Sequence, residues 1–162
     1  MRHGESDGNA NGLCQGHSPG YLTTNGLSQA TSLGSTLFSK GEYDDIYCSD
    51  LTRVTQTLQA SMATTRSFTD SVIYDSLLRE KSAGIFEGKK RELMQNARTR
   101  SGLDERLYQP QDGESWQQLQ DRVKLFYGKI KEKYNGKSHS RLLVYTSGGI
   151  HFKLLAANKL TY

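Results

Sequence analysis

The sequence predicts a single α/β domain, a three-layer sandwich whose mainly parallel sheet is flanked by helices. Residues 45–49 and 141–146 are short apolar runs with the composition of buried strands, and each leads through a polar turn into a helical pattern. Apolar residues elsewhere recur at helical spacing, so strands and helices alternate, as is typical of a parallel sheet covered by helices. No composition shift marks a linker, and we expect all 162 residues to form one domain.

Two amphipathic helices and a weaker strand are predicted in the first half of the chain. In residues 27–37, leucine and alanine recur every three or four positions, which places them on one face of a helix. Residues 51–62 show the same spacing after the first strand, and Asp50 stands where an N-cap side chain is favoured. A brief apolar run at residues 71–74 predicts the weaker strand.

Helices dominate the second half. Residues 92–100 are a polar helix candidate, and the longest helix is expected over residues 114–134, where apolar and aromatic side chains form one stripe. We interpret Glu114 and Ser115 as helix-start residues, with the negative charge in the first turn. A last helix is expected from about Gly149, after the second strand.

Composition excludes several classes of protein. The chain is 35% hydrophobic and 23% charged, with a net charge of +4 and a mean hydropathy of −0.68, which indicates a polar globular protein. No apolar run approaches the roughly 20 residues of a membrane span, and the N-terminus is polar, so we expect no signal peptide. Cys14 and Cys48 lack metal-binding spacing and are too few for a disulfide scaffold. We therefore expect a cytoplasmic protein with no membrane, metal or cofactor requirement.

The first chemical motif opens the chain. Arg2 and His3 are followed by Gly4, and this combination suits phosphate chemistry, because a guanidinium grips phosphate oxygens and a neutral imidazole can attack phosphorus. The small net charge suits a phosphate ester as well as it suits a nucleic acid. A lone histidine near a polar terminus is also compatible with a solvated bystander.

Three further motifs lie in ligand-binding positions of an α/β fold. Arg53 follows a buried strand at a helix start, which points it toward the sheet edge where such proteins bind ligands, although a solvated face also suits it. Glu80 lies in a glycine-punctuated loop and suits a general acid, or a surface ion pair with a neighbouring base. The turn at residues 146–149 suits anion binding by backbone N–H groups, or an ordinary strand–helix connection.

The order of these motifs resembles the histidine phosphatase superfamily, in its phosphoglycerate-mutase-like branch. The resemblance covers essentially the whole chain. The matching positions are Arg2, His3, Gly4, Glu5, Ser6 and Asn9; Gln15, Gly16, Leu22, Thr23, Gly26, Gln29 and Ala30; Ser49, Leu51, Arg53, Gln56 and Thr57; Leu78, Arg79, Glu80, Gly84, Glu87 and Gly88; and Gly113, Glu114, Ser115 and Arg122.

The resemblance implies roles for particular residues. His3 resembles the nucleophile that becomes phosphohistidine, Arg2 and Arg53 resemble the pair that holds the phosphoryl group, and Glu80 resembles the proton donor to the leaving oxygen. Ser147 occupies the catalytic position of a second histidine. The positions implied to bind substrate are Asn9, Gln15, Gly16 and Gly148.

Two departures from the family pattern affect these expectations. Ser147 is neutral where the family usually has histidine, and losing one such donor costs about 10²–10³ in rate elsewhere, so we expect reduced activity. Met1 stands where the family has a short apolar strand, so the first strand is expected to be missing and His3 to be poorly anchored. We expect a single histidine-phosphatase-like domain over residues 1–162, truncated at both ends.

Three functional hypotheses remain open. The first is a phosphatase for small phosphorylated metabolites, of fructose-bisphosphatase-like or broad specificity, because the segment 89–112 is shorter than in phosphoglycerate mutases. The second is a pseudophosphatase that binds phosphorylated ligands or partners. The third, a nucleic-acid binder, rests on charge alone and is not expected. Basic residues that either guide an anionic substrate or form a solvated helix face are Lys89, Lys90, Arg91, Arg98 and Arg100.

Overall fold

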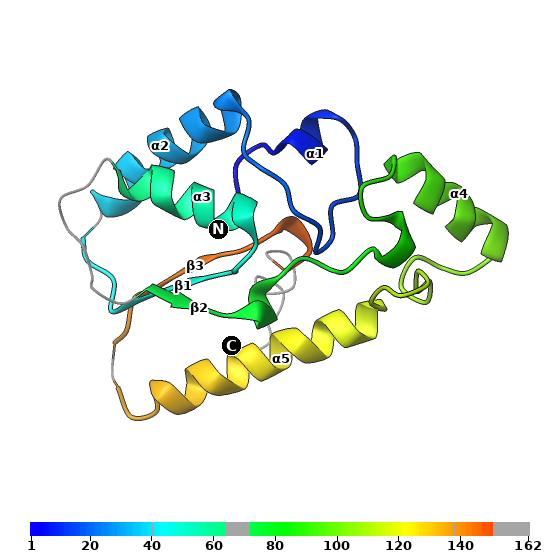
Figure 1. Cartoon of the computed structure of the whole chain (residues 1–162). Coiled ribbons are helices and arrows are strands. Elements are labelled where there is room, and N and C mark those ends of the chain that lie inside the picture. The colour runs from blue at the N-terminus through cyan, green and yellow to red at the C-terminus, as the bar shows by residue number, and fades with distance from the viewer. Residues whose placement is uncertain (40, 64–71, 138, 151–162) are drawn as a thin grey trace.

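The computed structural model describes residues 1–39, 41–63, 72–137 and 139–150. Helices and strands alternate along the chain, with two short 3₁₀ helices, η1 and η2, after the second strand (Figure 1). In chain order the elements are α1 (Asp7–Ala10), α2 (Thr24–Phe38), β1 (Asp45–Cys48), α3 (Thr52–Met62), β2 (Val72–Tyr74), η1 (Ser76–Leu78), η2 (Gly84–Phe86), α4 (Arg91–Ser101), α5 (Trp116–Lys133) and β3 (Leu142–Tyr145).

The described strands form a parallel sheet with the order β2-β1-β3, as the sequence predicts. Ile46 of β1 pairs with Val72 of β2 on one side and with Leu143 of β3 on the other. Every residue of β1 is buried, because the strand lies at the centre of the sheet and both of its faces are covered.

Helices cover both faces of the sheet and create a separate core on each side (Figure 1). Ile46 and Cys48 of β1 pack on one face with α2 and α3, while Tyr47 packs on the other face with α5. Phe126 of α5 meets the Tyr47 ring edge-on at 5.4 Å between centroids. Alternate side chains of one strand therefore join different cores, which produces the predicted three layers.

The segment Met1–His3 is attached to the sheet beside the end of β3. Arg2 forms a parallel bridge with Thr146. The His3 N–H donates to the Thr146 carbonyl at 3.0 Å, and the Thr146 N–H donates to the Met1 carbonyl at 2.8 Å. The expectation of a poorly anchored His3 is therefore corrected, since backbone bonds to the strand hold this segment.

Two predicted helix starts are wrong in detail. Asp50 does not cap α3, whose N-cap is Leu51 with no side-chain hydrogen bond. Its carboxylate instead accepts two bonds from the Arg79 guanidinium, at 2.7 and 2.5 Å. Glu114 does not lie in the first turn of α5, because Ser115 is the N-cap and forms a capping box with Gln118.

Other differences concern the two ends of the chain. The long N-terminal loop contains the short helix α1, which was not predicted, and its N-cap Ser6 forms a capping box with Asn9. The predicted last helix lies mostly outside the described residues, of which 148–150 are helical. Among the described helices, none has the length and apolar character that a membrane crossing requires.

Candidate active site

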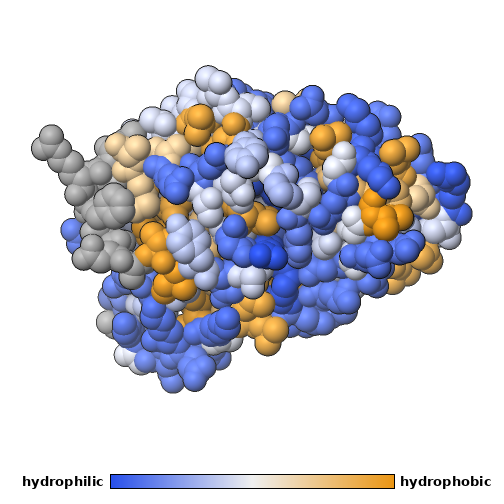
Figure 2. Space-filling view, in the orientation of Figure 1, coloured by the Kyte–Doolittle hydropathy of each residue, from blue (hydrophilic) through white to orange (hydrophobic). Residues whose placement is uncertain are grey.

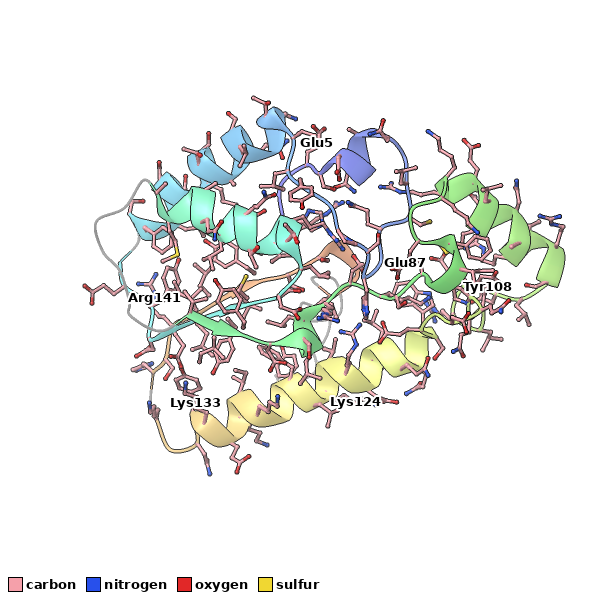
Figure 3. The ribbon with its side chains drawn as sticks, in the orientation of Figure 1. Glu5, Glu87, Tyr108, Lys124, Lys133 and Arg141 are labelled. Atoms are coloured by element: carbon pink, nitrogen blue, oxygen red, sulfur yellow. The ribbon has the colours of Figure 1, made fainter. Side chains whose placement is uncertain are left out.

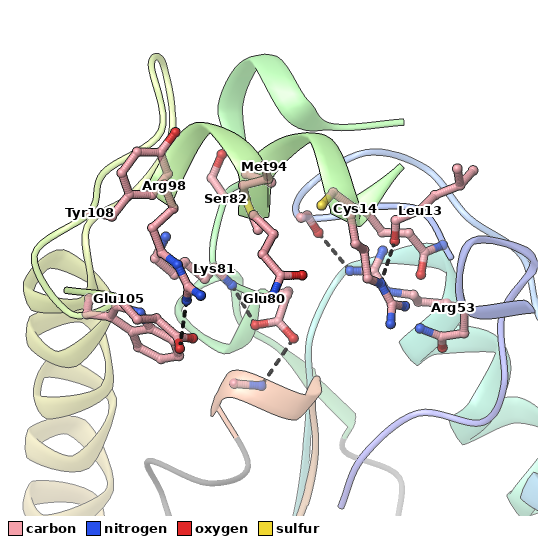
Figure 4. A pocket seen from close by; sticks show the side chains of 18 of the residues that line it. Leu13, Cys14, Arg53, Glu80, Lys81, Ser82, Met94, Arg98, Glu105 and Tyr108 are labelled. Carbon is pink, nitrogen blue, oxygen red and sulfur yellow. Dashed lines mark hydrogen bonds and ion pairs between the residues drawn. The ribbon is translucent and has the colours of Figure 1, made fainter. Parts of the chain in front are cut away.

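Seven of the nine predicted site residues converge at the carboxyl ends of the strands, where they line a cavity of about 550 Å³ (Figure 4). His3 comes from the segment beside β3, Arg53 from the first turn of α3, and Glu80 from the loop after η1. Parallel strands bring these loops to one edge, because all of their carboxyl ends point the same way. Residues distant in sequence therefore share one cavity.

The His3 imidazole is buried and oriented by the backbone. Its exposed fraction is 9%, and Nδ1 lies 2.7 Å from the Gly4 carbonyl oxygen, so Nδ1 carries the proton and donates it. Burial, together with the positive charges of Arg53 and Arg2, lowers the pKa of His3 to about 4, against the opposing bond to Gly4. At neutral pH the ring is uncharged and its Nε2 lone pair is available for attack.

The two arginines of the site differ in their surroundings. Arg53 is 1% exposed, and its Nη2 and Nη1 donate to the carbonyls of Gly16 at 2.7 Å and Ser18 at 3.2 Å. Burial lowers the pKa of its guanidinium, but nearby carboxylates, Glu80 among them, act in the opposite direction. Arg2 is exposed and lines the same cavity. One rigid and one accessible guanidinium thus face the place where an anion would lie.

Glu80 is held by backbone donors. Its Oε1 accepts from the Lys81 N–H at 2.8 Å, and its Oε2 accepts from the Gly149 N–H at 3.1 Å (Figure 4). A Cβ at position 149 would lie 2.5 Å from Glu80 Oε1, so a larger residue there would displace the carboxyl group from its present position. The turn after β3 therefore contacts the carboxyl group directly.

The residues implied to bind substrate are placed unequally. Asn9, Gln15 and Gly16 line the cavity. The Gln15 amide oxygen accepts from Ser6 Oγ at 2.6 Å, which fixes its orientation. Gly148 is not part of the described lining. The turn after β3 contributes Gly149 to it instead.

Ser147 has its side chain in the protein interior. It is fully buried, and its hydroxyl has no hydrogen-bond partner among the described residues. It is also absent from the described lining of the cavity. Among the described residues, the turn after β3 therefore lines the cavity through Gly149 and not through the Ser147 side chain.

Sequence reasoning missed most of the outer wall of the cavity, which we define as the part contributed by α4, the loop after it and the start of α5. Arg91 and Arg98 were candidates from their charge, whereas the apolar and aromatic members had no local signal. Lys89, Lys90 and Arg100 are not part of the described lining. The described outer wall comprises Arg91, Met94, Gln95, Arg98, Glu105, Tyr108 and Trp116.

Glu87 was a motif residue without a predicted role, and it joins two loops of the site. Its Oε1 accepts from the His17 N–H at 2.9 Å and from the Ala83 N–H and Ser82 Oγ, both at 3.0 Å. Gly16 permits this junction, because its φ is +49° and a Cβ there would lie 2.2 Å from Glu87 Oε1. Figure 3 shows Glu87 between the sheet and α4.

The charged residues of the cavity lining are predominantly basic. The described lining contains the cations Arg2, Arg53, Lys81, Arg91 and Arg98 and the carboxylates Glu80 and Glu105. Arg98 is paired with Glu105 at 3.0 Å, and Lys81 lies 5.8 Å from the centroid of the Trp116 ring. Figure 2 shows hydrophilic residues over much of the visible face, with hydrophobic ones in separate groups. The excess of cations favours an anionic ligand.

The fold and the site agree with one family. The chain belongs to the histidine phosphatase superfamily (branch 1), whose family model matches residues 1–159. Its relatives include "Fructose-2,6-bisphosphatase TIGAR" of Mus musculus, which is 32% identical over 143 residues, or 87% of this chain and 53% of the relative. The "Adenosylcobalamin/alpha-ribazole phosphatase" of Escherichia coli is 31% identical over 160 residues, covering 96% of this chain and 75% of that protein. The chain spans about half the length of the fructose-2,6-bisphosphatases that it matches.

Solved structures give the same result. An alpha-ribazole phosphatase from Shigella flexneri is similar with a TM-score of 0.82 and 30% identity, over 97% of this chain and 76% of that one. A phosphoglycerate mutase from Bacillus anthracis has a TM-score of 0.85 at 24% identity, over 96% of this chain and 76% of its own. The latter likeness concerns the fold alone, which is therefore phosphoglycerate-mutase-like.

Proposed function

We propose that this chain is a phosphomonoester hydrolase that forms a phosphohistidine intermediate on His3. The observation that carries the proposal is the state of His3, which is neutral, buried and fixed by its Nδ1 bond to Gly4, so that Nε2 is the nucleophilic atom. Arg53 and Glu80 line the same cavity, where they supply positive charge and a carboxyl group.

The proposed reaction has two steps. His3 Nε2 attacks phosphorus, the P–O ester bond breaks, and the leaving oxygen takes the proton of the Glu80 carboxyl. Water then attacks the phosphohistidine, Glu80 takes a proton from that water, and the P–N bond breaks with its electron pair returning to Nε2. Inorganic phosphate leaves, and both side chains are restored. Arg2 and Arg53 stabilise the charge on the phosphoryl oxygens throughout.

The proposed substrates are small phosphorylated metabolites. Phosphatases of fructose bisphosphates, of alpha-ribazole phosphate and of broad specificity are among the relatives by name. The cavity of about 550 Å³ has room for a leaving group beyond a phosphate, and its outer wall combines cations with Met94, Tyr108 and Trp116. Fructose-bisphosphatase-like or broad specificity is compatible with such a mixed wall.

The alternative is a pseudophosphatase that binds phosphorylated ligands or partners without hydrolysing them. The observation that favours it is Ser147, whose hydroxyl is buried outside the described lining at the position where the family resemblance implies a histidine. In that case Arg2 and Arg53 would still bind a phosphate, but no phosphoryl group would pass to His3.

Trapping of the intermediate separates the two functions. The chain and its His3→Gln variant are incubated with a radiolabelled phosphomonoester, quenched in alkali and analysed for acid-labile label. We expect label on the wild type only, because the amide of glutamine is not nucleophilic. Binding of phosphate without any label on wild-type protein would support the pseudophosphatase. We expect the chelator EDTA to leave the rate unchanged, because in the proposed steps arginine side chains stabilise the negative charge of the phosphoryl oxygens.

A further inference from the structure

We propose that Arg122 and Glu114 are positioning residues that fix the loop carrying Glu80 and thereby aim its carboxyl group at the leaving oxygen. This inference rests on the proposed function for the role of Glu80. It assigns a task to a pair of motif residues that lie outside the described lining of the cavity and behind the site.

The Arg122 guanidinium is bound from two directions. Its Nε and Nη2 donate to the two Glu114 carboxylate oxygens at 2.8 and 2.7 Å, which is a bidentate pair. Its Nη1 donates to the carbonyls of Leu77 at 2.8 Å and Arg79 at 2.9 Å, and Nη2 also donates to the Glu80 carbonyl at 3.1 Å. One side chain of α5 thus contacts three carbonyls of the segment that ends at Glu80.

Glu114 extends the same support to the far side of Glu80. Its Oε2 accepts from the Ser82 N–H at 2.9 Å, so the pair binds the chain before and after Glu80. His17 adds a second donor to the Glu80 carbonyl, with Nε2 at 2.8 Å from that oxygen. The backbone of Glu80 is consequently held from α5 and from the N-terminal loop, while its carboxyl group faces the cavity.

The pair is suited to a structural task because it stays charged in a partly buried place. The side chains of Arg122 and Glu114 are 15% and 18% exposed. Burial alone would raise the pKa of the Glu114 carboxyl, but hydrogen bonds from Arg122 and the Ser82 N–H outweigh it and hold the pKa below its ordinary value. Five N–H donations from one guanidinium require its planar fork, which lysine cannot supply.

Loss of this support has a specific kinetic signature. A displaced Glu80 protonates the leaving oxygen poorly, while His3 still attacks phosphorus and the arginines still hold the phosphoryl oxygens. The rate then falls for a leaving group that needs a proton and is retained for one that does not. A general loss of folded protein lowers both rates equally, so the ratio of the two rates isolates positioning from stability.

The experiment compares p-nitrophenyl phosphate with phenyl phosphate, which have the same ring and differ in the need for a proton on the leaving oxygen. Their kcat/KM values are measured for the wild type, Arg122→Gln and Glu80→Gln. We expect Glu80→Gln to raise the ratio of kcat/KM for the nitrophenyl ester to kcat/KM for the phenyl ester by about 10²-fold. This is the lower end of the range for general acid catalysis. We expect Arg122→Gln to raise it by at least about tenfold, and Arg122→Lys by less.

Asp50→Asn is the matched control. It removes another bidentate arginine pair next to the same loop, since Arg79 binds Asp50 through two nitrogens without bonding the Glu80 carbonyl. We expect its ratio to equal that of the wild type. An Arg122→Gln ratio equal to the wild-type ratio, with Glu80→Gln raised, would overturn the inference and leave the proposed function intact.

Crystal structures of the variants test the positioning role without an activity assay. In Arg122→Gln, or in Glu114→Gln if the first variant does not fold, we expect Glu80 Oε2 to leave the Gly149 N–H that it accepts from in the wild type. An unmoved carboxyl group would overturn the inference. A wild type that hydrolyses neither ester would instead contradict the proposed function, and the position of Glu80 would still decide the positioning role.

Discussion

Acidification should destabilise this protein through His3. The imidazole has a folded-state pKa of about 4, against an ordinary value of 6.5, because burial and two arginines disfavour its charged form. Between these values the unfolded chain binds a proton that the folded chain does not, so stability falls as the pH falls from about 6.5 to 4. At about 1.4 kcal/mol per unit, the full contribution is about 3 kcal/mol.

The assay is urea unfolding of the wild type and of His3→Gln at a series of pH values. Other titrating groups are common to both proteins, so the difference between their unfolding free energies isolates His3. We expect the wild type to lose about 2 kcal/mol more than the variant between about pH 7 and about pH 4.5. Parallel curves for the two proteins would refute the reasoning, since they would mean that His3 titrates alike in both states.

Three further substitutions test the site. Arg53→Lys should lower kcat/KM by about 10²-fold or more, because an ammonium cannot keep the bonds to Gly16 and Ser18 and also grip the phosphoryl oxygens; steady-state rates near wild type would contradict this role. Gly16→Ala should cost about 1–3 kcal/mol in thermal unfolding, because its φ is +49° and the new Cβ would meet Glu87 at 2.2 Å; an unchanged Tm would count against the junction. Ser147→His should raise turnover by up to about 10²-fold, and His3→Gln in the same background should abolish the gain; unchanged turnover in a folded variant would mean that the missing histidine is not limiting.

Local pattern was sufficient for the strands and the longer helices, though not for α1, and for the first set of site residues. The strand-length apolar runs at residues 45–49 and 141–146 contain β1, which is buried throughout, and β3, in which buried and half-buried residues alternate. Their short length and the polar turns that follow them distinguish them from the helices. Arg53 and Glu80 were predicted to lie near His3 because parallel strands end at one edge. The structure places all three in the lining of one cavity, whereas Ser147, which was predicted to meet them there, is outside the described lining. What the pattern did not predict were the partners of particular charges.

The sequence by itself determined the alternation of strands and helices, the parallel sheet and the order of the phosphate-binding motifs, because these depend on spacing along the chain. Only the tertiary structure decided that Asp50 pairs with Arg79 instead of capping α3, and that Glu114 binds Arg122 instead of the helix dipole. It alone brought Tyr108 to the cavity. A carboxylate pairs with a guanidinium that lies within hydrogen-bonding distance. That distance is fixed only when loops far apart in sequence meet at the sheet edge.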